Sequence, residues 1–129
     1  MSSDPGQAET IAFLSDPRSY RGAAERVEVI TTHASVVFLA GDRAYKLKRA
    51  VKYTYLDYST VDLRRQACQA ELALNRRTAP ALYIAVLPVM RRPEGGLALD
   101  GPGTALDWLV VMRRFPQEAL FSHLVEQSK

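Results

Sequence analysis

The chain has 129 residues, of which 47% are hydrophobic and 24% charged, and its formal net charge is +3 at pH 7. This length suits one domain with its own core, and the composition excludes wholesale disorder. The sequence holds no run of ~18 apolar residues to span a membrane and no secretory signal pattern at its N-terminus. The single cysteine, Cys68, can form no internal disulfide, which fits a cytoplasmic protein.

The first part of the chain predicts a tail and a short helix. We expect residues 1–7 to be a loose tail and residues 8–14 to form a helix that Asp16-Pro17 stops. Residues 18–26 predict a loop. The chain is therefore expected to divide into an N-terminal tail and helix over 1–24 and a main unit over 25–129.

Alternating apolar residues predict antiparallel strands at the start of the main unit, at residues 27–32, 35–40 and 43–49. Residues 51–58 are aromatic but irregular, which indicates a connector on the surface. Ser59 or Thr60 then caps a strong helix that runs to Arg77. Asp62 lies in its first turn, where negative charge suits the helix dipole.

Apolar segments predict further strands after this helix, at residues 82–90, 97–99 and 106–112. Pro88 argues for an edge position or a bulge in the first of these strands. The last segment is the most hydrophobic run of the chain and is expected to be a central strand. Pro116 suits the first turn of a closing helix over 117–127.

This order of elements predicts an α+β fold: an antiparallel sheet of about five or six strands with one long helix packed on it, plus a C-terminal helix. On the long helix, apolar residues at helical spacing predict the stripe that faces the sheet. They are Leu63, Ala67, Ala70 and Leu74. Arg64 is expected to lie largely off this stripe, and Glu71 lies at its edge.

A β-hairpin is the centre of the candidate site. Two apolar runs flank Gly41-Asp42, which is typical of a hairpin with a two-residue turn. In this register Val37 faces Lys46, and Ala44 lies on the same side of the sheet. An apolar surface with one projecting lysine suits a flat base and a phosphate. The alternative is an edge-strand lysine that discourages aggregation.

Charged residues near the hairpin also indicate an anion site. Between residues 43 and 52 the sequence has cations and no acid: Arg43, Lys46, Lys48, Arg49 and Lys52. Such a cluster favours phosphate or another polyanion, and a solvated strand end is the alternative. A carboxylate at the edge of an apolar stripe costs free energy unless it is paired. Glu71 and Lys46 would satisfy each other, whereas a surface Glu71 would pair with Arg64 or Asn75.

The chain resembles the small lobe of the protein-kinase-like fold in the order of its features. These are strand, turn, a strand with Ala44-Tyr45-Lys46, a helix with an inward glutamate, and a hydrophobic strand that leads to a short connector. More closely, the chain resembles the bacterial aminoglycoside-phosphotransferase-like family over roughly residues 25–129. One group of that family, in which a P-loop ATPase-like domain often follows, carries runs similar to Val37–Arg49, Glu71–Arg77 and Val111–Pro116.

The resemblance implies ATP as the cofactor. In that family Lys46 would contact the α- and β-phosphates of ATP, and Glu71 would hold Lys46 in place. Val37 and Ala44 would roof the adenine. Lys48 is the rival of Lys46 because it points the same way, but Ala44 precedes Lys46 in the Ala-x-Lys pattern.

Met112 would lie at the back of the pocket, and the backbone of Arg113 to Phe115 would meet the adenine edge as a hinge. The chain departs from protein kinases at residues 32–35, which lack a G-x-G-x-x-G loop. No aspartate follows Asp107, although phosphoryl transfer needs catalytic and Mg²⁺-binding carboxylates or amides. The family implies Mg²⁺, but its ligands and the large lobe are expected to be missing from this chain.

We therefore expect the ATP-binding small lobe of a phosphotransferase, truncated and inactive alone. Its complete form would transfer the γ-phosphoryl group of ATP to a hydroxyl of a small molecule. A basic module that binds an anion or RNA is the alternative, and a non-functional remnant of a longer gene is a third hypothesis. Nucleic acid is disfavoured because aromatic residues are poorly interleaved with the basic ones. His33, His123 and Cys68 lack metal-ligand spacing.

Overall fold

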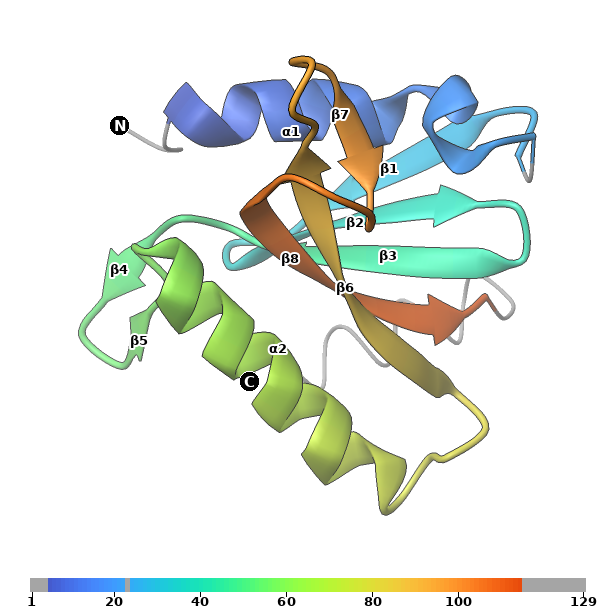
Figure 1. Cartoon of the computed structure of the whole chain (residues 1–129). Coiled ribbons are helices and arrows are strands. Elements are labelled where there is room, and N and C mark those ends of the chain that lie inside the picture. Colours follow the sequence, from blue (N-terminus) through green and yellow to red (C-terminus); the bar gives the residue numbers. More distant parts are fainter. Residues whose placement is uncertain (1–4, 23, 115–129) are drawn as a thin grey trace.

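The structure, a computed structural model, describes residues 5–22 and 24–114 of the chain. At its centre is a six-stranded antiparallel sheet with the order β1-β2-β3-β8-β6-β7. Figure 1 shows the long helix α2 lying across this sheet. The strands are β1 (Val27–Thr31), β2 (Ser35–Ala40), β3 (Arg43–Lys48), β6 (Tyr83–Arg91), β7 (Leu97–Leu99) and β8 (Thr104–Arg113). The predicted α+β fold is confirmed.

The remaining elements are helical or form a small hairpin of their own. They are α1 (Pro5–Ser15), the 3-10 helix η1 (Pro17–Tyr20), α2 (Val61–Arg76), and the hairpin of β4 (Lys52–Tyr53) and β5 (Leu56–Asp57). The hairpin occupies the segment predicted as a surface connector. The predicted helix over 117–127 lies outside the described residues, and the boundary near residue 24 stays a prediction.

Helix α1 begins earlier than expected. Proline suits the first turn of a helix, and α1 starts at Pro5. Gln7 is buried, with 2% of its surface exposed. The prediction of a loose tail was therefore wrong for residues 5–7, because the Gln7 amide has buried hydrogen-bond partners that the local sequence does not reveal.

The β2–β3 hairpin has the predicted register. Val37 pairs with Lys46, and Leu39 pairs with Ala44. Gly41 has a φ of 63°, the left-handed conformation that the two-residue turn needs and that glycine adopts without strain. Alternate residues of β3 therefore point to opposite faces of the sheet, and Lys46 lies on the face that α2 covers.

Strand β8 is central, as predicted, because it pairs with both β3 and β6. The short strand β7 pairs only with residues 89–91 of β6. Pro88 lies just beyond that pairing, and the register between β6 and β8 shifts between Val89 and Met90. Both observations agree with the expectation that Pro88 marks an edge or a bulge.

Helix α2 is capped as expected but faces the sheet with a different stripe. The Thr60 side chain accepts a hydrogen bond from Leu63 N at 3.1 Å. The residues turned inward include Arg64 and Cys68, both buried, whereas Leu74 is 66% exposed. The predicted stripe through Leu74 was wrong, and so was the outward placement of Arg64, because Arg64 finds a buried carboxylate on β8.

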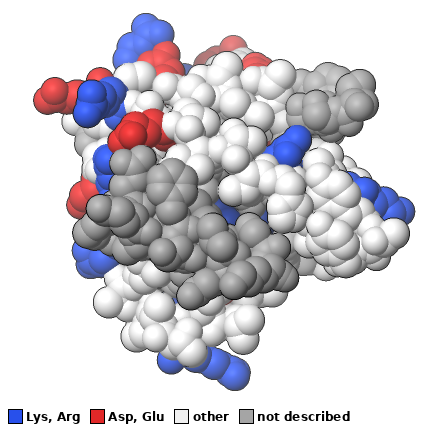
Figure 2. Space-filling view, turned by 180° about the vertical axis from the view of Figure 1, so that it is seen from behind, with Lys and Arg blue, Asp and Glu red and all other residues white. Residues whose placement is uncertain are grey.

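Charged side chains do not form one continuous patch on the face shown in Figure 2. Lys and Arg side chains stand mostly apart along its edges, with Asp and Glu between several of them. The basic run in the sequence is also divided by burial. Lys46 and Lys48 are 5% and 4% exposed, whereas Arg43 and Lys52 lie at the surface. The run therefore separates into a buried pair and scattered surface cations.

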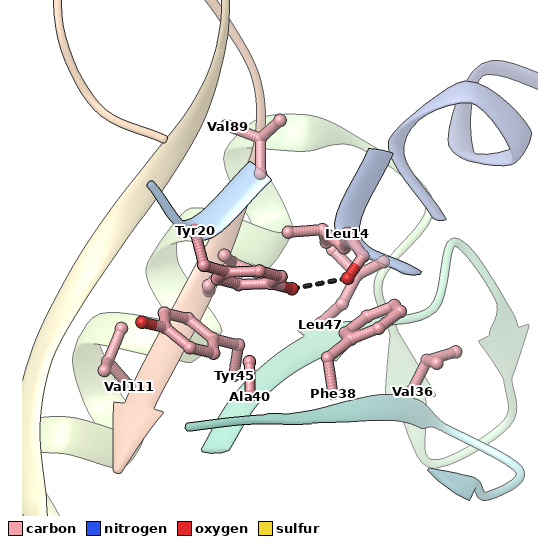
Figure 3. Packing of buried hydrophobic residues seen from close by; sticks show 10 residues of the cluster. Leu14, Tyr20, Val36, Phe38, Ala40, Tyr45, Leu47, Val89 and Val111 are labelled. Carbon is pink, nitrogen blue, oxygen red and sulfur yellow. Dashed lines mark hydrogen bonds between the residues drawn. The ribbon is translucent and has the colours of Figure 1, made fainter. Parts of the chain in front are cut away.

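The sheet carries an apolar core on each face. One core lies under α1 and η1 and is formed around Leu14, Tyr20, Phe38, Tyr45, Leu47 and Val111. Figure 3 shows Tyr20 over Tyr45, with ring centres 5.0 Å apart, and the Tyr20 hydroxyl donating to Leu14 O. The other core lies under α2 and includes Val37, Leu39, Ala44, Cys68, Val110 and Met112. None of the helices in the described ranges is both long and apolar enough to cross a membrane.

Candidate functional site

Two lysines of β3 meet one carboxylate of α2 at the centre of the site. Lys46 Nζ lies 3.1 Å from Glu71 Oε2, and Lys48 Nζ contacts Glu71 Oε1. The side chains of Lys46, Lys48 and Glu71 are 6%, 5% and 10% exposed. The predicted pairing of Lys46 with Glu71 is confirmed. Lys48, expected as a rival, joins the same cluster.

The local sequence explains this cluster. Side chains two residues apart on a strand share a face, so the Lys-x-Lys spacing of β3 sends both ammonium groups toward α2. Helix α2 presents Glu71 from the turn that follows Cys68, which packs against the sheet. The surface alternative for Glu71 does not occur. Asn75 Nδ2 donates to the backbone carbonyl of Glu71, at 2.9 Å, and not to its carboxylate.

Burial and charge oppose each other within the cluster. Burial raises the pKa of Glu71, but the charges of Lys46 and Lys48 outweigh it and hold that pKa below its usual value. Burial lowers the pKa of Lys46, Glu71 opposes this, and Lys48 adds to it, so the pKa of Lys46 ends below its usual value. Burial also acts on Lys48, but Glu71 and Tyr58 prevail and raise its pKa.

A pocket of about 470 Å³ opens beside the cluster. Its walls come from the β1–β2 turn, β3, the β4–β5 hairpin and α2. The lining residues are Thr32, His33, Ala34, Ser35, Lys46, Lys48, Tyr55, Leu56, Tyr58, Ala70, Glu71, Leu74 and Asn75. The pocket therefore combines two buried ammonium groups with an apolar and aromatic wall, which suits a small anionic ligand.

The β1–β2 turn at the rim is held in place by neighbouring side chains. Arg49 Nη1 donates to the carbonyls of Thr32 and His33, both at 3.0 Å. The Tyr53 hydroxyl donates to the His33 carbonyl at 3.1 Å. The rings of Tyr53 and Tyr55 stack 5.7 Å apart, and His33 lies against both. The turn without glycines thus has a fixed conformation that the β4–β5 hairpin supports.

The other predicted site residues lie away from this pocket. Val37, Ala44 and Met112 lie in the core between the sheet and α2, on the same face of the sheet as Lys46. Each is 0% exposed, and none lines the pocket. Arg113 is exposed, and its backbone N–H donates to Leu82 O at 2.8 Å. Phe115 lies outside the described residues. The adenine-facing roles of these residues stay predictions.

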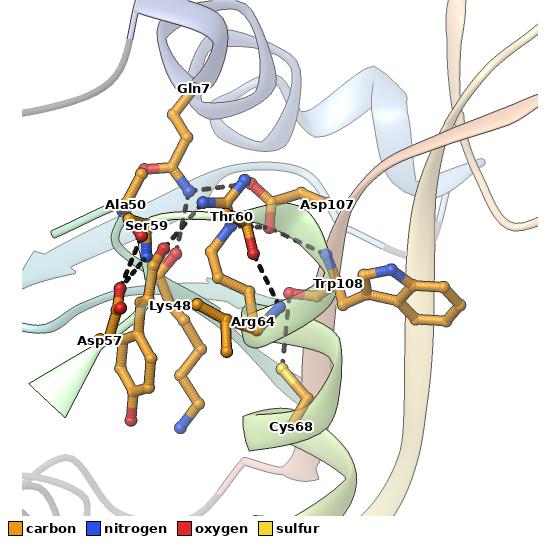
Figure 4. Close-up of polar contacts among 12 residues, drawn as sticks. Gln7, Lys48, Ala50, Asp57, Ser59, Thr60, Arg64, Cys68, Asp107 and Trp108 are labelled. Atoms are coloured by element: carbon orange, nitrogen blue, oxygen red, sulfur yellow. Dashed lines mark hydrogen bonds and ion pairs between the residues drawn. The ribbon is translucent and has the colours of Figure 1, made fainter. Parts of the chain in front are cut away.

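A second buried polar cluster lies next to the first, and sequence reasoning missed it (Figure 4). Arg64 Nε donates to Asp107 Oδ1 at 2.9 Å, and Gln7 Nε2 donates to Asp107 Oδ2 at 2.8 Å. Gln7 also holds the end of β3, since it donates to Lys48 O and accepts from Ala50 N. The aspartate within the hydrophobic run 106–112 was the available signal, because a carboxylate there needs buried partners.

The two clusters share Lys48. Figure 4 shows its side chain extending away from Gln7 and Asp107, while its backbone carbonyl accepts from Gln7. The Nζ atom lies 5.5 Å from the centre of the Tyr58 ring. Burial raises the pKa of Asp107 above its usual value, although the hydrogen bond from Gln7 and the charge of Arg64 oppose that rise. Buried polar contacts thereby join helix α1, strand β8 and helix α2.

Cys68 lies between these clusters at the contact of α2 with the sheet. It is 0% exposed, and its Sγ lies 3.7 Å from Trp108 O. Burial raises the pKa of its thiol to about 12, so a thiolate nucleophile is not available here. No group of three or more His, Cys, Asp or Glu side chains in the described part of the chain could hold a metal ion.

Curated proteins similar to this chain include the uncharacterized protein Rv2004c of Mycobacterium tuberculosis and the uncharacterized protein Mb2027c of Mycobacterium bovis. Each is 35% identical over 99 residues, which make up 77% of this chain but 18% of the relative. The chain thus spans less than a fifth of the length of these relatives. A scan against protein-family models found no match, and no solved structure matched the chain.

Proposed function

We propose that this chain is the ATP-binding small lobe of a phosphotransferase that resembles aminoglycoside phosphotransferases. In the complete protein, the reaction is transfer of the γ-phosphoryl group of ATP to a hydroxyl of a small molecule. The observation that carries the proposal is the ion pair between Lys46 of the central hairpin and Glu71 of α2. In protein kinases, a strand lysine paired with a helix glutamate positions the phosphates of ATP.

The chemistry of the pocket supports a phosphate ligand. Lys46 and Lys48 both line it, and a buried ammonium group attracts an anion more strongly than a solvated one does. The Tyr55 and Leu56 side chains add an apolar wall. The β1–β2 turn closes one side of the pocket and takes the place of a glycine-rich loop.

The adenine end of the proposed site makes a specific demand. Val37, Ala44 and Met112 lie on the same sheet face as Lys46, which suits a flat apolar ring. They are fully buried, so nucleotide entry requires this face to open. Mg²⁺ does not fit the described residues, which offer no cluster of acidic ligands, and its ligands would come from another part of the protein.

Calorimetric titration of the chain with ATP and ADP tests the proposal. We expect weak binding that Lys46→Ala abolishes, because the phosphates lose their ammonium partner. Arg43→Ala is the matched control: it removes one positive charge from the exposed end of the same strand and should leave nucleotide binding intact. Nucleotide binding that is absent, or that survives Lys46→Ala, would contradict the proposal.

The same variants separate the nucleotide site from an RNA-binding surface. An RNA surface built on the exposed cations would lose affinity in Arg43→Ala but not in Lys46→Ala, because Lys46 is buried, and its affinity would fall steeply with salt. A nucleotide pocket should respond to Lys46→Ala alone and depend less on salt, because its charges are buried. RNA affinity that falls in Arg43→Ala but not in Lys46→Ala, with a steep salt dependence, would therefore favour the alternative.

A further inference from the structure

Glu71 gives each of its carboxylate oxygens to a different lysine. Lys46 Nζ contacts Oε2, and Lys48 Nζ contacts Oε1. The ammonium group of Lys46 has three N–H donors, so it can contact Glu71 and a phosphate in the pocket at the same time. A phosphate nevertheless draws Lys46 toward itself, and a buried carboxylate whose contact with its counter-ion is weakened is unfavourable.

We propose that Lys48 is a positioning residue that holds Glu71 through its second carboxylate oxygen, so that Glu71 stays in place and keeps Lys46 oriented while Lys46 donates to a phosphate. This inference rests on the proposed function, in which Lys46 meets the phosphates of a nucleotide. Lys46 is then the residue that contacts the ligand, and Lys48 acts through Glu71.

The contacts of Lys48 suit this role because they come from several elements. Its side chain is 5% exposed, and its Nζ lies over the Tyr58 ring. Its backbone carbonyl accepts from Gln7 Nε2 at 2.9 Å, and Gln7 is fixed in turn by Asp107. Lys48 is therefore anchored at its backbone carbonyl and at the ammonium end of its side chain, as a fixed counter-ion should be.

The pKa values of the two lysines shift in opposite directions. Among the described residues, the charged and titratable groups that face Lys46 are Lys48 on its own strand and Glu71 and Cys68 on α2. Burial and the neighbouring Lys48 charge lower the pKa of Lys46, against the effect of Glu71. The pKa of Lys48 is raised, because Glu71 and Tyr58 outweigh burial.

The test compares the 129-residue chain with Lys48→Met and Lys48→Arg. Methionine keeps an apolar stem but removes the charge, and arginine restores the charge. ADP affinity is measured by calorimetry, and the pKa of Lys46 by the pH dependence of its ¹³Cε shift without ligand. We expect Lys48→Met to weaken ADP binding roughly tenfold, a size usual for coupled neighbours. We also expect it to raise the pKa of Lys46, because a like charge is removed, and Lys48→Arg to reverse both effects.

Each outcome of this comparison decides a separate point. Unchanged ADP affinity in Lys48→Met overturns the inference if the wild-type chain binds ADP. An unchanged pKa of Lys46 in Lys48→Met overturns the inference whether or not the wild-type chain binds ADP. This holds even where Lys48→Met weakens ADP binding only because it lowers stability. A wild-type chain that binds no nucleotide contradicts the proposed function, and the Lys46 pKa then still decides whether Lys48 and Lys46 share Glu71. Arg43→Met, on the exposed end of β3, should change neither quantity.

Discussion

At the residue scale, the buried charges of this protein come in groups rather than in isolated pairs. Glu71 lies between two lysines, and Asp107 lies between Arg64 and Gln7. A buried charge needs its full set of partners because removing a charged group from water costs free energy that only those partners offset. Removal of one member of such a group should therefore lower the free energy of unfolding more than removal of one member of a surface ion pair would.

The pH dependence of stability should carry the signature of Glu71. Its pKa in the folded chain lies below the ordinary value of 4.5. Because an acid with a lowered pKa stabilises the folded state when ionised, this contribution is complete above pH 4.5 and is lost as the pH falls through the folded pKa. Urea unfolding of the wild type and Glu71→Gln should show a stability difference that shrinks in acid. A difference that stays constant down to about pH 3 would contradict this.

Truncation of Arg64 should be strongly destabilising. Arg64→Ala leaves the Asp107 carboxylate buried without its cation, which costs about 3–5 kcal/mol in the free energy of unfolding. A double variant, Arg64→Met with Asp107→Leu, should recover much of that loss because no charge remains buried. Urea unfolding checks both. The neighbouring Arg65→Ala is the control and should stay near wild type, and equal losses in Arg64→Ala and Arg65→Ala would refute the buried pair.

At the element scale, helix α2 shows what helical periodicity can and cannot predict. The sequence located the helix correctly and gave Ser59 or Thr60 as its cap, of which Thr60 is the one observed. It assigned the inward face from apolar residues alone, and that face is rotated in the structure. Arg64 points inward because it donates a hydrogen bond to the buried Asp107 carboxylate on β8. The buried ion pair between Arg64 and Asp107 thus sets the inward face of the helix, although this leaves Leu74 exposed.

Two leucines on α2 provide a direct test of this rotation. Leu72 packs against the α2-side core, whereas Leu74 is 66% exposed. Because the substitution is the same, helix propensity cancels between Leu72→Ala and Leu74→Ala. We expect Leu72→Ala to cost about 1–2 kcal/mol and Leu74→Ala less than about 0.5 kcal/mol in urea unfolding. The reverse order would restore the stripe that the sequence predicted.

At the scale of the whole molecule, the sheet is covered on both faces. Helix α2 covers the face that carries the lysines, and α1 with η1 covers the other. Figure 1 shows α1 and α2 on separate sides of the strands. The N-terminal segment therefore contributes side chains to the core on one face of the sheet, and it reaches the candidate site through Gln7.

A substitution in α1 should consequently destabilise the whole unit. Leu14 is 0% exposed in the core under α1, so Leu14→Ala should cost about 2–5 kcal/mol in global unfolding. Glu9, whose carboxylate pairs with Arg91 at the surface, offers a control in the same helix, and Glu9→Ala should leave stability nearly unchanged. Local fraying of α1 without a change in global unfolding, measured by hydrogen exchange, would argue against a shared core.

The sequence was sufficient for the six strands of the main sheet and for the pairing of Lys46 with Glu71. Alternation and the Gly41-Asp42 turn predicted the hairpin register, and the register placed Lys46 opposite Val37. Glu71 followed from the cost of an unpaired carboxylate. Asp107, within an apolar run, indicated a need for buried partners, but no local pattern identifies Gln7, which is 100 residues away in the sequence, as one of them.

Cys68 gives the protein an internal reporter. Its thiol is buried where α2 meets the sheet, and its pKa of about 12 keeps it protonated. A thiol reagent can modify it only when α2 lifts from the strands. The labelling rate of this one cysteine therefore measures how often the wall of the lysine pocket opens, without any engineered probe. A ligand that bridges β3 and α2 should slow that rate in proportion to its occupancy.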